Sequence, residues 1–403
     1  MKNKSNYSDK YWTAGKKRME VNYWIYQHTI GPWIRHKYGY KADTFTPQSK
    51  TFLALVNHTN GMDQFFMAMM FPRYVRFVAA ESILRKPVTG FLIAHLQKPI
   101  PRKKGESGAE ASRYIKRNLI NGISVAMFPE GVRTNNGRTG FISPRTVQLL
   151  RDTGAGLINC RIYGGYLSAP LWAKFIREGH VHAEMVAEYT PDILAKMTDD
   201  EIYEAICRDL YVNAYEVQRK EMISYDGDNF AEGIENVLYI CPHCGKSDTL
   251  KSSGNKVTCS CGLNGTLDSY GFFNGENLQF DNICDWESWQ RDRLKELSEV
   301  WKNEKNVLIS KSPKVTLHQI NNNIDDIIAE NAEMRLYSDH LEFATEKKKV
   351  LFNIDEIAEV SNFKSTVFIF KANEMRYEVR CGEVWPIFKY IAIIRMLKGK
   401  KYL

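Results

Sequence analysis

The sequence predicts two folded domains of different class. The first is an α/β domain with a mixed, largely parallel sheet and flanking helices, and the second is a C-terminal β-rich domain closed by a helix. Apolar runs alternate with helical segments between about residues 50 and 190. Four of the eight cysteines cluster within 241–261. Within 305–403, short β-like runs begin with MRLY at 334–337 and precede a final amphipathic segment. A chain of 403 residues is long enough for two or three such units.

Residues 1–44 are predicted to form a basic, aromatic helical arm. The first 40 residues hold eight Lys or Arg against two Asp or Glu, a net charge of +6 out of +8 for the chain. Gly31-Pro32 predicts a break into two short helices. Aromatic rings beside cations suit an anionic membrane surface, whereas packing of the same helices on the protein's own core is an almost equal alternative.

The chain shows no run near the ~20 apolar residues that span a bilayer. The first 30 residues also lack the apolar core and cleavage site of a signal peptide. We therefore expect a cytoplasmic protein that is peripheral on the inner face of the cell membrane.

The α/β domain is predicted over 45–225. Strand-like runs occur in this part of the chain, with a helix over 107–121 and helical character over 198–225. Parallel sheets bind ligands at the carboxyl ends of their strands, and His58 and Glu130 each follow a strand. The predicted strands are 51–56, 76–80, 123–128 and 155–162.

His58 and Asp63 form a possible pair of a base and its orienting acid. A neutral imidazole accepts a proton from a hydroxyl when its other nitrogen donates to a fixed acceptor. A carboxylate about a turn away can supply that acceptor. Taken alone the pair favours a structural histidine, because this spacing arises often by chance.

A second polar cluster, FPEGVRT at 128–134, closes the strand over 123–128. Gly131 shapes a turn with Pro129, Glu130 can orient a neighbouring cation, and Arg133 offers a fork for phosphate. Between the clusters lies a basic loop, KPIPRKKGES at 98–107, with Arg102 followed by Lys103 and Lys104. A basic loop ahead of a helix is a natural anion site.

The motif NHxxxxD at 57–63, followed by FPEGxR at 128–133, resembles the glycerolipid acyltransferase superfamily, typified by 1-acyl-glycerol-3-phosphate acyltransferase. The resemblance covers about 45–190. It implies transfer of a fatty acyl group from acyl-CoA or acyl carrier protein to the hydroxyl of a lysophospholipid, with lysophosphatidic acid the first expectation. The family's last motif, a proline in an apolar strand, is poorly matched by 158–170. Another lipid acceptor, or a non-catalytic scaffold of the same fold, is the alternative.

The resemblance also implies a role for each motif residue. His58 would be the general base and Asp63 would hold it. The substrate-binding residues would be Asn57, Arg102, Glu130, Gly131 and Arg133.

The cysteine cluster predicts a structural Zn²⁺ site in a zinc ribbon over 236–268. Two knuckles, CPHC and CSC, are separated by 14 residues, and four thiolates so spaced can close a tetrahedral site. His243 is a reserve ligand. A nucleic-acid partner is not expected, because this module carries three Lys against two Asp and one aromatic residue. The predicted ligands are Cys241, Cys244, Cys259 and Cys261.

The remaining chain predicts an amphipathic connector helix over 285–304, with Asp285 as its N-cap. The small β domain over 305–403 resembles the pleckstrin-homology and GRAM-like group in its pattern of strands followed by a helix at 385–397. Three lysines at 347–349 could meet an anionic headgroup, and a solvated hairpin explains them equally well.

Overall fold

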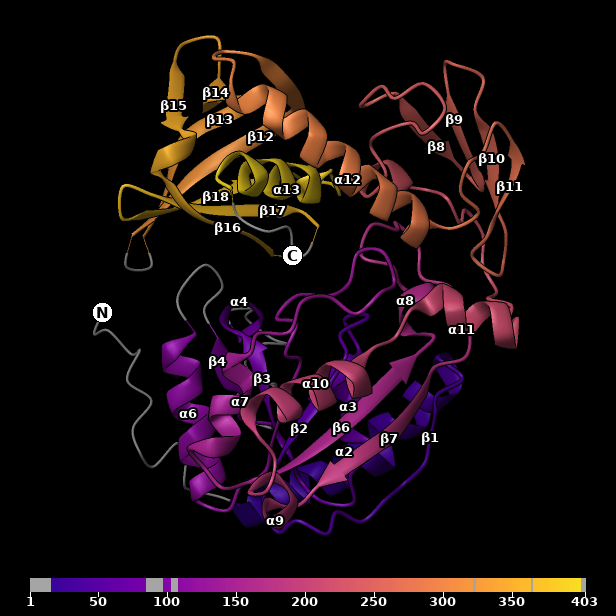
Figure 1. Ribbon diagram of the computed structural model, residues 1–403, viewed down its shortest axis with the longest axis vertical. Coiled ribbons are helices and arrows are strands. Elements are labelled where there is room, and N and C mark those ends of the chain that lie inside the picture. The colour runs from indigo at the N-terminus through magenta and orange to yellow at the C-terminus, as the bar shows by residue number, and fades with distance from the viewer. Residues whose placement is uncertain (1–15, 85–96, 103–107, 322–323, 364, 400–403) are drawn as a thin grey trace. The chain divides into compact units, whose positions relative to one another are not determined.

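The computed structural model describes residues 16–84, 97–102, 108–321, 324–363 and 365–399 (Figure 1). The chain divides into two compact units. The first consists of residues 1–169 and 178–225, and the second of residues 170–177 and 226–403. Lys103 and Lys104 of the predicted basic loop lie outside the described residues.

The described part of the first unit contains a seven-stranded sheet with the order β1-β7-β6-β2-β5-β3-β4. Neighbouring strands run parallel except β6 and β7, which are antiparallel. This confirms the prediction of a mixed, largely parallel sheet. The strands are β1 (Lys41–Ala42), β2 (Phe52–Val56), β3 (Arg76–Ala80), β4 (Ile100–Arg102), β5 (Val125–Met127), β6 (Gly156–Tyr163) and β7 (His182–Tyr189).

Helices cover both faces of this sheet (Figure 1). In β2, Ala54 and Val56 pack into a core with residues of α2 and α3, whereas Leu53 and Leu55 pack with residues of α6, α7 and α10. Strand β2 is therefore buried on both faces, as parallel strands commonly are. The helices are α2 (Lys16–Lys37), α3 (Asp63–Ala68), α4 (Glu81–Leu84), α6 (Ala109–Ile120), α7 (Arg145–Arg151), α8 (Gly165–Ser168), α9 (Pro191–Leu194), α10 (Asp199–Leu210) and α11 (Ala214–Glu221).

The prediction that Gly31-Pro32 splits the N-terminal arm is wrong, because α2 continues through Pro32. An interior proline costs a helix about 3 kcal/mol. Packing on both sides of it offsets this cost: Tyr23 and Tyr26 before it and Ile34 after it enter the same core. The hydroxyl of Tyr26 also donates to the carbonyl of Phe65 at 3.1 Å.

In the described part of the second unit, a four-stranded antiparallel sheet of order β11-β10-β9-β8 follows a short 3₁₀ helix, η1 (Ile234–Asn236). Its strands carry or flank the second cysteine knuckle. They are β8 (Leu250–Ser253), β9 (Lys256–Cys259), β10 (Asn264–Leu267) and β11 (Phe273–Glu276).

Helix α12 (Ile283–Lys302) begins earlier than predicted, and Asp285 is not its N-cap. Asn282 occupies that position, since its side chain accepts from the N–H of Asp285 at 2.9 Å. The Asp285 carboxylate accepts from the Asn282 amide at 2.7 Å, so each side chain supports the other. Trp286 and Gln290 of α12 bind main-chain groups at 237–240, immediately before the first cysteine.

The C-terminal sheet has seven antiparallel strands among the described residues, in the order β15-β14-β13-β12-β18-β17-β16. Helix α13 (Ile387–Leu397) packs with it in one core, which confirms a β-rich domain closed by a helix. The strands are β12 (Leu308–Asn321), β13 (Ile324–Tyr337), β14 (His340–Ala344), β15 (Lys349–Asn353), β16 (Ile357–Phe363), β17 (Val367–Ala372) and β18 (Met375–Arg380), with a 3₁₀ turn, η2 (Ile354–Glu356), between β15 and β16.

Strand β12 and most of β13 were missed from sequence. Their pairing carries several register shifts, one of them between Lys311 and Lys314 around Pro313. Each bulge inserts an extra residue and breaks the two-residue alternation by which a strand is recognised.

Candidate active site

His58 and Asp63 lie in hydrogen-bond contact after the carboxyl end of β2. The Nδ1 atom of His58 is 2.7 Å from Oδ2 of Asp63. His58 follows β2 by two residues, and Asp63 is the first residue of α3. A turn of four residues therefore folds the acid back onto the imidazole, as the spacing predicted.

The carboxylate of Asp63 is completely buried and accepts from three further donors. Thr59 donates through its main-chain N–H and, at 2.7 Å, through its hydroxyl. The main-chain N–H of Asn60 donates at 2.9 Å. A carboxylate surrounded by donors acts only as an acceptor. The hydrogen on the His58 ring is therefore assigned to Nδ1, which leaves Nε2 as a proton acceptor.

The imidazole of His58 is fixed from a second side as well. Its ring stacks on Phe128 with centroids 4.3 Å apart and an interplanar angle of 15°. The main-chain N–H of His58 donates to Oε1 of Glu130 at 2.6 Å, and its carbonyl accepts from the N–H of Thr134 at 2.9 Å. The side chain still keeps 20% of its surface exposed, so a substrate can approach the ring.

Glu130 joins two main-chain segments. Besides His58, its carboxylate accepts from the N–H of Gly140 through Oε2 at 2.6 Å. Glu130 retains some exposure as a residue. Burial nevertheless raises the pKa of its carboxyl to about 8, against the opposing effect of the two hydrogen bonds. The structure thus gives Glu130 contacts with N–H groups, whereas the sequence predicted that it orients a cation.

Two guanidinium groups border the same loops. A Cβ added at Gly131 would stand 3.1 Å from Nη1 of Arg102, and one added at Gly61 would stand 3.7 Å from Nη1 of Arg133. Gly131 has φ +72°, a conformation that glycine adopts without strain. Within the described parts of the chain, no hydrogen bond or ion pair engages either guanidinium. Both remain available to an anion.

Asn57 is engaged with the sheet. Its side-chain oxygen accepts from the N–H of Ile162 at 2.7 Å, and its amide donates to the carbonyl of the same residue at 2.9 Å. The side chain is buried and extends the pairing of β2 with β6 beyond Val56. These contacts hold the start of the His58 loop against β6.

No sequence pattern indicates that Thr59, Asn60 and Gly165 belong to the site. Asn60 donates through its side-chain amide to the carbonyl of Gly165 at 2.9 Å, and its oxygen accepts from the N–H of Met62 at 2.6 Å. Any Cβ at Gly165 would overlap the hydroxyl of Thr59. The weakly matched family motif at 158–170 therefore contains a glycine that makes room for the support of Asp63.

The four predicted metal ligands converge in the second unit. The sulfur atoms of Cys241, Cys244, Cys259 and Cys261 all lie within 4.8 Å of one another. Two of the separations are 3.6 Å, for Cys241 and Cys261, and 3.9 Å, for Cys244 and Cys259. A tetrahedral Zn²⁺ with bonds of about 2.3 Å requires sulfurs about 3.8 Å apart. The donor set and its spacing fit zinc, and His243, with Nδ1 3.3 Å from the sulfur of Cys261, lies beside the four.

Comparison with known proteins agrees with this geometry. Residues 40–163 match the model of the Acyltransferase family. They contain the loops that carry His58, Asp63, Arg102, Glu130 and Arg133. The protein is an acyltransferase.

Two curated relatives and one solved structure are similar to parts of the chain. The 1-acyl-sn-glycerol-3-phosphate acyltransferase of Limnanthes douglasii is 26% identical over 219 residues, which cover 51% of this chain and 74% of that enzyme. The enzyme of the same name from Limnanthes alba is 27% identical over 158 residues, 37% of this chain and 54% of that enzyme. The 1-acyl-sn-glycerophosphate (LPA) acyltransferase PlsC from Thermotoga maritima matches with a TM-score of 0.38 and 16% identity, over 50% of this chain and 96% of that one.

Proposed function

We propose that the protein transfers a fatty acyl group from a thioester, acyl-CoA or acyl carrier protein, to the hydroxyl of a lysophospholipid. Lysophosphatidic acid is the first candidate acceptor, as the names of the curated relatives suggest. The observation that carries the proposal is the contact of His58 with buried Asp63, in loops that the guanidinium groups of Arg102 and Arg133 border. This arrangement supplies a base for a hydroxyl and charge for a phosphate.

His58 acts as the general base in the proposed mechanism. Its Nε2 takes the proton of the acceptor hydroxyl as the oxygen attacks the thioester carbonyl. Asp63 holds the Nδ1 hydrogen and stabilises the imidazolium that forms. The tetrahedral intermediate then expels the thiolate, which receives the proton from Nε2. The products are an acyl ester and a free thiol, and His58 returns to its neutral form.

Arg102 and Arg133 bind the acceptor phosphate in this proposal. Guanidinium groups match phosphate oxygens in a two-bond fork. Gly131 lets Arg102 approach the turn after β5, because any side chain there would contact the guanidinium. Glu130 and Asn57 act through the main chain, by holding the two loops around His58. A different lysolipid or lipid acceptor is the second candidate, since the 158–170 segment departs from the family pattern.

We further propose that α2 docks on an anionic membrane surface. Val21, Trp24 and Trp33 are each more than half exposed, whereas Tyr23 and Ile34 face the core. Basic residues stand at both ends of the helix, and Lys37 Nζ lies 5.5 Å from the centre of the Trp33 ring. Exposed tryptophans beside cations favour the interfacial zone of a bilayer. In the described residues, no helix is long and apolar enough to cross a membrane.

We propose structural roles for the second unit. Four thiolates would hold a structural Zn²⁺ that fastens the two knuckles of the ribbon. The likeness of 305–403 to the pleckstrin-homology and GRAM-like group remains a proposal based on strand pattern. A location on the inner face of the cell membrane is proposed with it.

The test is transfer of a labelled acyl group to a panel of lysolipids, each with acyl-CoA and with acyl carrier protein as donor. His58→Ala should lower turnover at least ~10²-fold if His58 is the base. His180→Ala, in an exposed histidine outside both motifs and outside α2, is the matched control and should retain activity. Product formed equally well by wild type and by His58→Ala would contradict the mechanism. If wild type forms product with another lysolipid but none with lysophosphatidic acid, the acceptor is that other lysolipid.

A further inference from the structure

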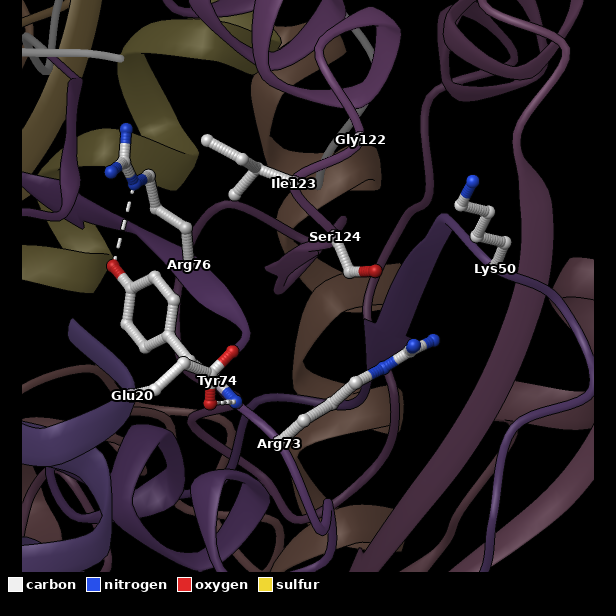
Figure 2. Close-up of a pocket in the computed structure, with 8 residues that line it drawn as sticks. All are labelled: Glu20, Lys50, Arg73, Tyr74, Arg76, Gly122, Ile123 and Ser124. Atoms are coloured by element: carbon white, nitrogen blue, oxygen red, sulfur yellow. Dashed lines mark hydrogen bonds between the residues drawn. The ribbon is translucent and has the colours of Figure 1, made fainter. Parts of the chain in front are cut away.

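A basic hollow opens at the edge of the first-unit sheet opposite the candidate active site (Figure 2). It is lined by residues at the amino ends of three parallel strands. Lys50 precedes β2, Arg76 begins β3 and Ser124 precedes β5. His58 and Glu130 follow the carboxyl ends of β2 and β5. The five residues of β2 separate the two edges by about 17 Å.

The charge of this hollow favours an anion. Lys50, Arg73 and Arg76 line it against a single carboxylate, Glu20. One oxygen of Glu20 accepts from the main-chain N–H of Tyr74 at 3.0 Å, on the Tyr74 side of the hollow (Figure 2). Concave sites lined by one sign of charge concentrate ligands of the opposite sign.

Arg73 and Arg76 are held in place by the protein. Arg76 is 2% exposed and donates to the Asn118 side chain at 2.8 Å and to the Tyr74 hydroxyl at 3.3 Å. Arg73 donates one N–H to the carbonyl of Ser49 at 2.9 Å, and its guanidinium lies 5.4 Å from the centre of the Phe52 ring. A guanidinium has five N–H donors, so most of those on Arg73 are left for a ligand.

Two further donors face the same space. The Ser124 hydroxyl points toward the gap between Lys50 and Arg73 (Figure 2). Its oxygen accepts from the N–H of Phe52 at 3.3 Å, while no acceptor for its hydrogen exists among the described residues. Ser124 is only 5% exposed, which makes an unused donor costly. The ammonium of Lys50 likewise has no partner within the described part of the chain.

We propose that Lys50, Arg73 and Ser124 bind a phosphate group at a site distinct from the acyl-transfer site. The three side chains offer an ammonium, a fixed guanidinium and a hydroxyl, which are donors that phosphate oxygens accept. The enclosed part of the hollow measures about 30 Å³, roughly twice the space that one water requires. That space limits a ligand to a small anionic group such as phosphate, with the rest of its molecule outside the hollow.

Two sources can supply this phosphate, a soluble phosphate ester or the headgroup of an anionic lipid. Glu20, which lines the hollow, lies in α2, the helix proposed to dock on an anionic membrane. A headgroup source therefore rests on that proposed docking, whereas a soluble ester does not. The site does not depend on the acyl-transfer chemistry, so it can fail or succeed separately from the proposed function.

The experiment measures phosphate binding by the full chain at constant ionic strength. Calorimetry uses inorganic phosphate, and vesicle flotation compares phosphatidylcholine alone with phosphatidylcholine containing phosphatidic acid. The test variant is Lys50→Ala with Arg73→Gln, in which glutamine keeps an N–H for the Ser49 carbonyl. Lys196→Ala removes one exposed charge elsewhere in the same unit. Arg133→Gln, at the opposite edge, removes a guanidinium of the proposed acceptor site and so separates phosphate bound there from phosphate bound in the hollow.

The double variant should bind the phosphate source about tenfold more weakly or worse, because it lacks two charge-assisted bonds to the phosphate. Lys196→Ala should leave this binding unchanged, and the loss caused by the double variant should persist when Arg133→Gln is also present. Loss seen with inorganic phosphate identifies a soluble ester, and loss seen only in the phosphatidic acid-dependent part of flotation identifies a headgroup. If the double variant unfolds, Lys50→Ala alone takes its place. Equal binding by wild type and variant in both assays, or no binding by wild type in either, overturns the proposal.

Discussion

Lys389 Nζ donates to Oδ1 of Asp248 at 2.6 Å and so joins α13 to the loop after the first cysteine knuckle. The lysine side chain is 3% exposed, whereas that of Asp248 is 44% exposed. Burial lowers the pKa of Lys389, and Asp248 opposes that effect. The two partners therefore contribute unequally, because only the lysine carries a charge that water cannot reach.

We expect Asp248→Asn to be the more damaging change at this contact. It leaves a buried ammonium without its counter-ion, which should lower the free energy of unfolding by about 2 kcal/mol or more. Lys389→Met removes the buried charge at similar volume and should stay within about 1 kcal/mol of wild type. Denaturant unfolding of the two variants and of the double variant checks this order. The reverse order would show that the ion pair itself is the stabilising element.

Asp63→Asn should lower kcat roughly 10²–10⁴-fold while the fold persists. An asparagine oxygen at the position of Oδ2 can still accept from the N–H groups of Thr59 and Asn60 and from Nδ1 of His58. The neutral amide carries no negative charge, however, and cannot stabilise the imidazolium that forms when Nε2 takes a proton. Steady-state kinetics beside circular dichroism and the unfolding midpoint separate the chemical loss from a folding defect. Near wild-type turnover by a folded variant would exclude Asp63 as the orienting acid.

Gly165→Ala should reduce kcat at least about tenfold with a smaller change in KM, because small displacements of reacting groups are costly. The added methyl must displace the Thr59 hydroxyl, which binds Asp63. Gly108→Ala, at a position where a Cβ meets nothing within 4 Å, is the control.

A double-mutant cycle isolates this path. Thr59→Ala combined with Gly165→Ala should be no slower than Thr59→Ala alone, since the overlap has been removed. Additive losses would place the effect of Gly165 elsewhere.

Glu130 should make stability depend on pH in an uncommon direction for a carboxyl group. Its pKa in the fold, about 8, lies above the ordinary value of 4.5, so between these values the folded protein binds more protons than the unfolded chain. The contribution of Glu130 to stability is then present below about pH 4.5 and declines as pH rises toward 8.

Glu130→Gln does not titrate, so its unfolding free energy should fall less than that of wild type across this window. Denaturant midpoints at several pH values measure the difference between the two curves. A constant difference would mean that the pKa of Glu130 is unshifted in the fold.

Metal removal should loosen the ribbon. A chelator, or Cys244→Ser, should increase hydrogen exchange over 250–267 and release about one equivalent of zinc from protein purified with it. Strand β2 serves as the internal reference and should exchange as before. Cys381→Ser is a matched control outside the cluster. Protection of 250–267 that is unchanged by the chelator would refute a metal-dependent ribbon.

Patterns confined to a few neighbouring residues were predictable from sequence. The strands β2, β3 and β6 are short apolar runs with clear ends, and the contact of His58 with Asp63 follows from their spacing across one turn. The continuity of α2 was not predictable, because distant packing of Tyr26 and Ile34 offsets the local effect of Pro32. The hydrogen bond between Glu130 and the N–H of His58 joins residues 72 positions apart and was not predictable from sequence either.

The supports of His58 also impose an order on its assembly during synthesis. His58 and Asp63 are synthesised within a few residues of each other. Glu130, which accepts from the N–H of His58, and Gly165, against which the loop with Thr59 and Asn60 packs, are synthesised later. A nascent chain that ends before residue 165 therefore contains His58 and Asp63 but lacks part of the structure that supports their contact. In the proposed mechanism, His58 gains all of these supports only after more than a hundred further residues have been made, so unfinished chains are not expected to transfer an acyl group.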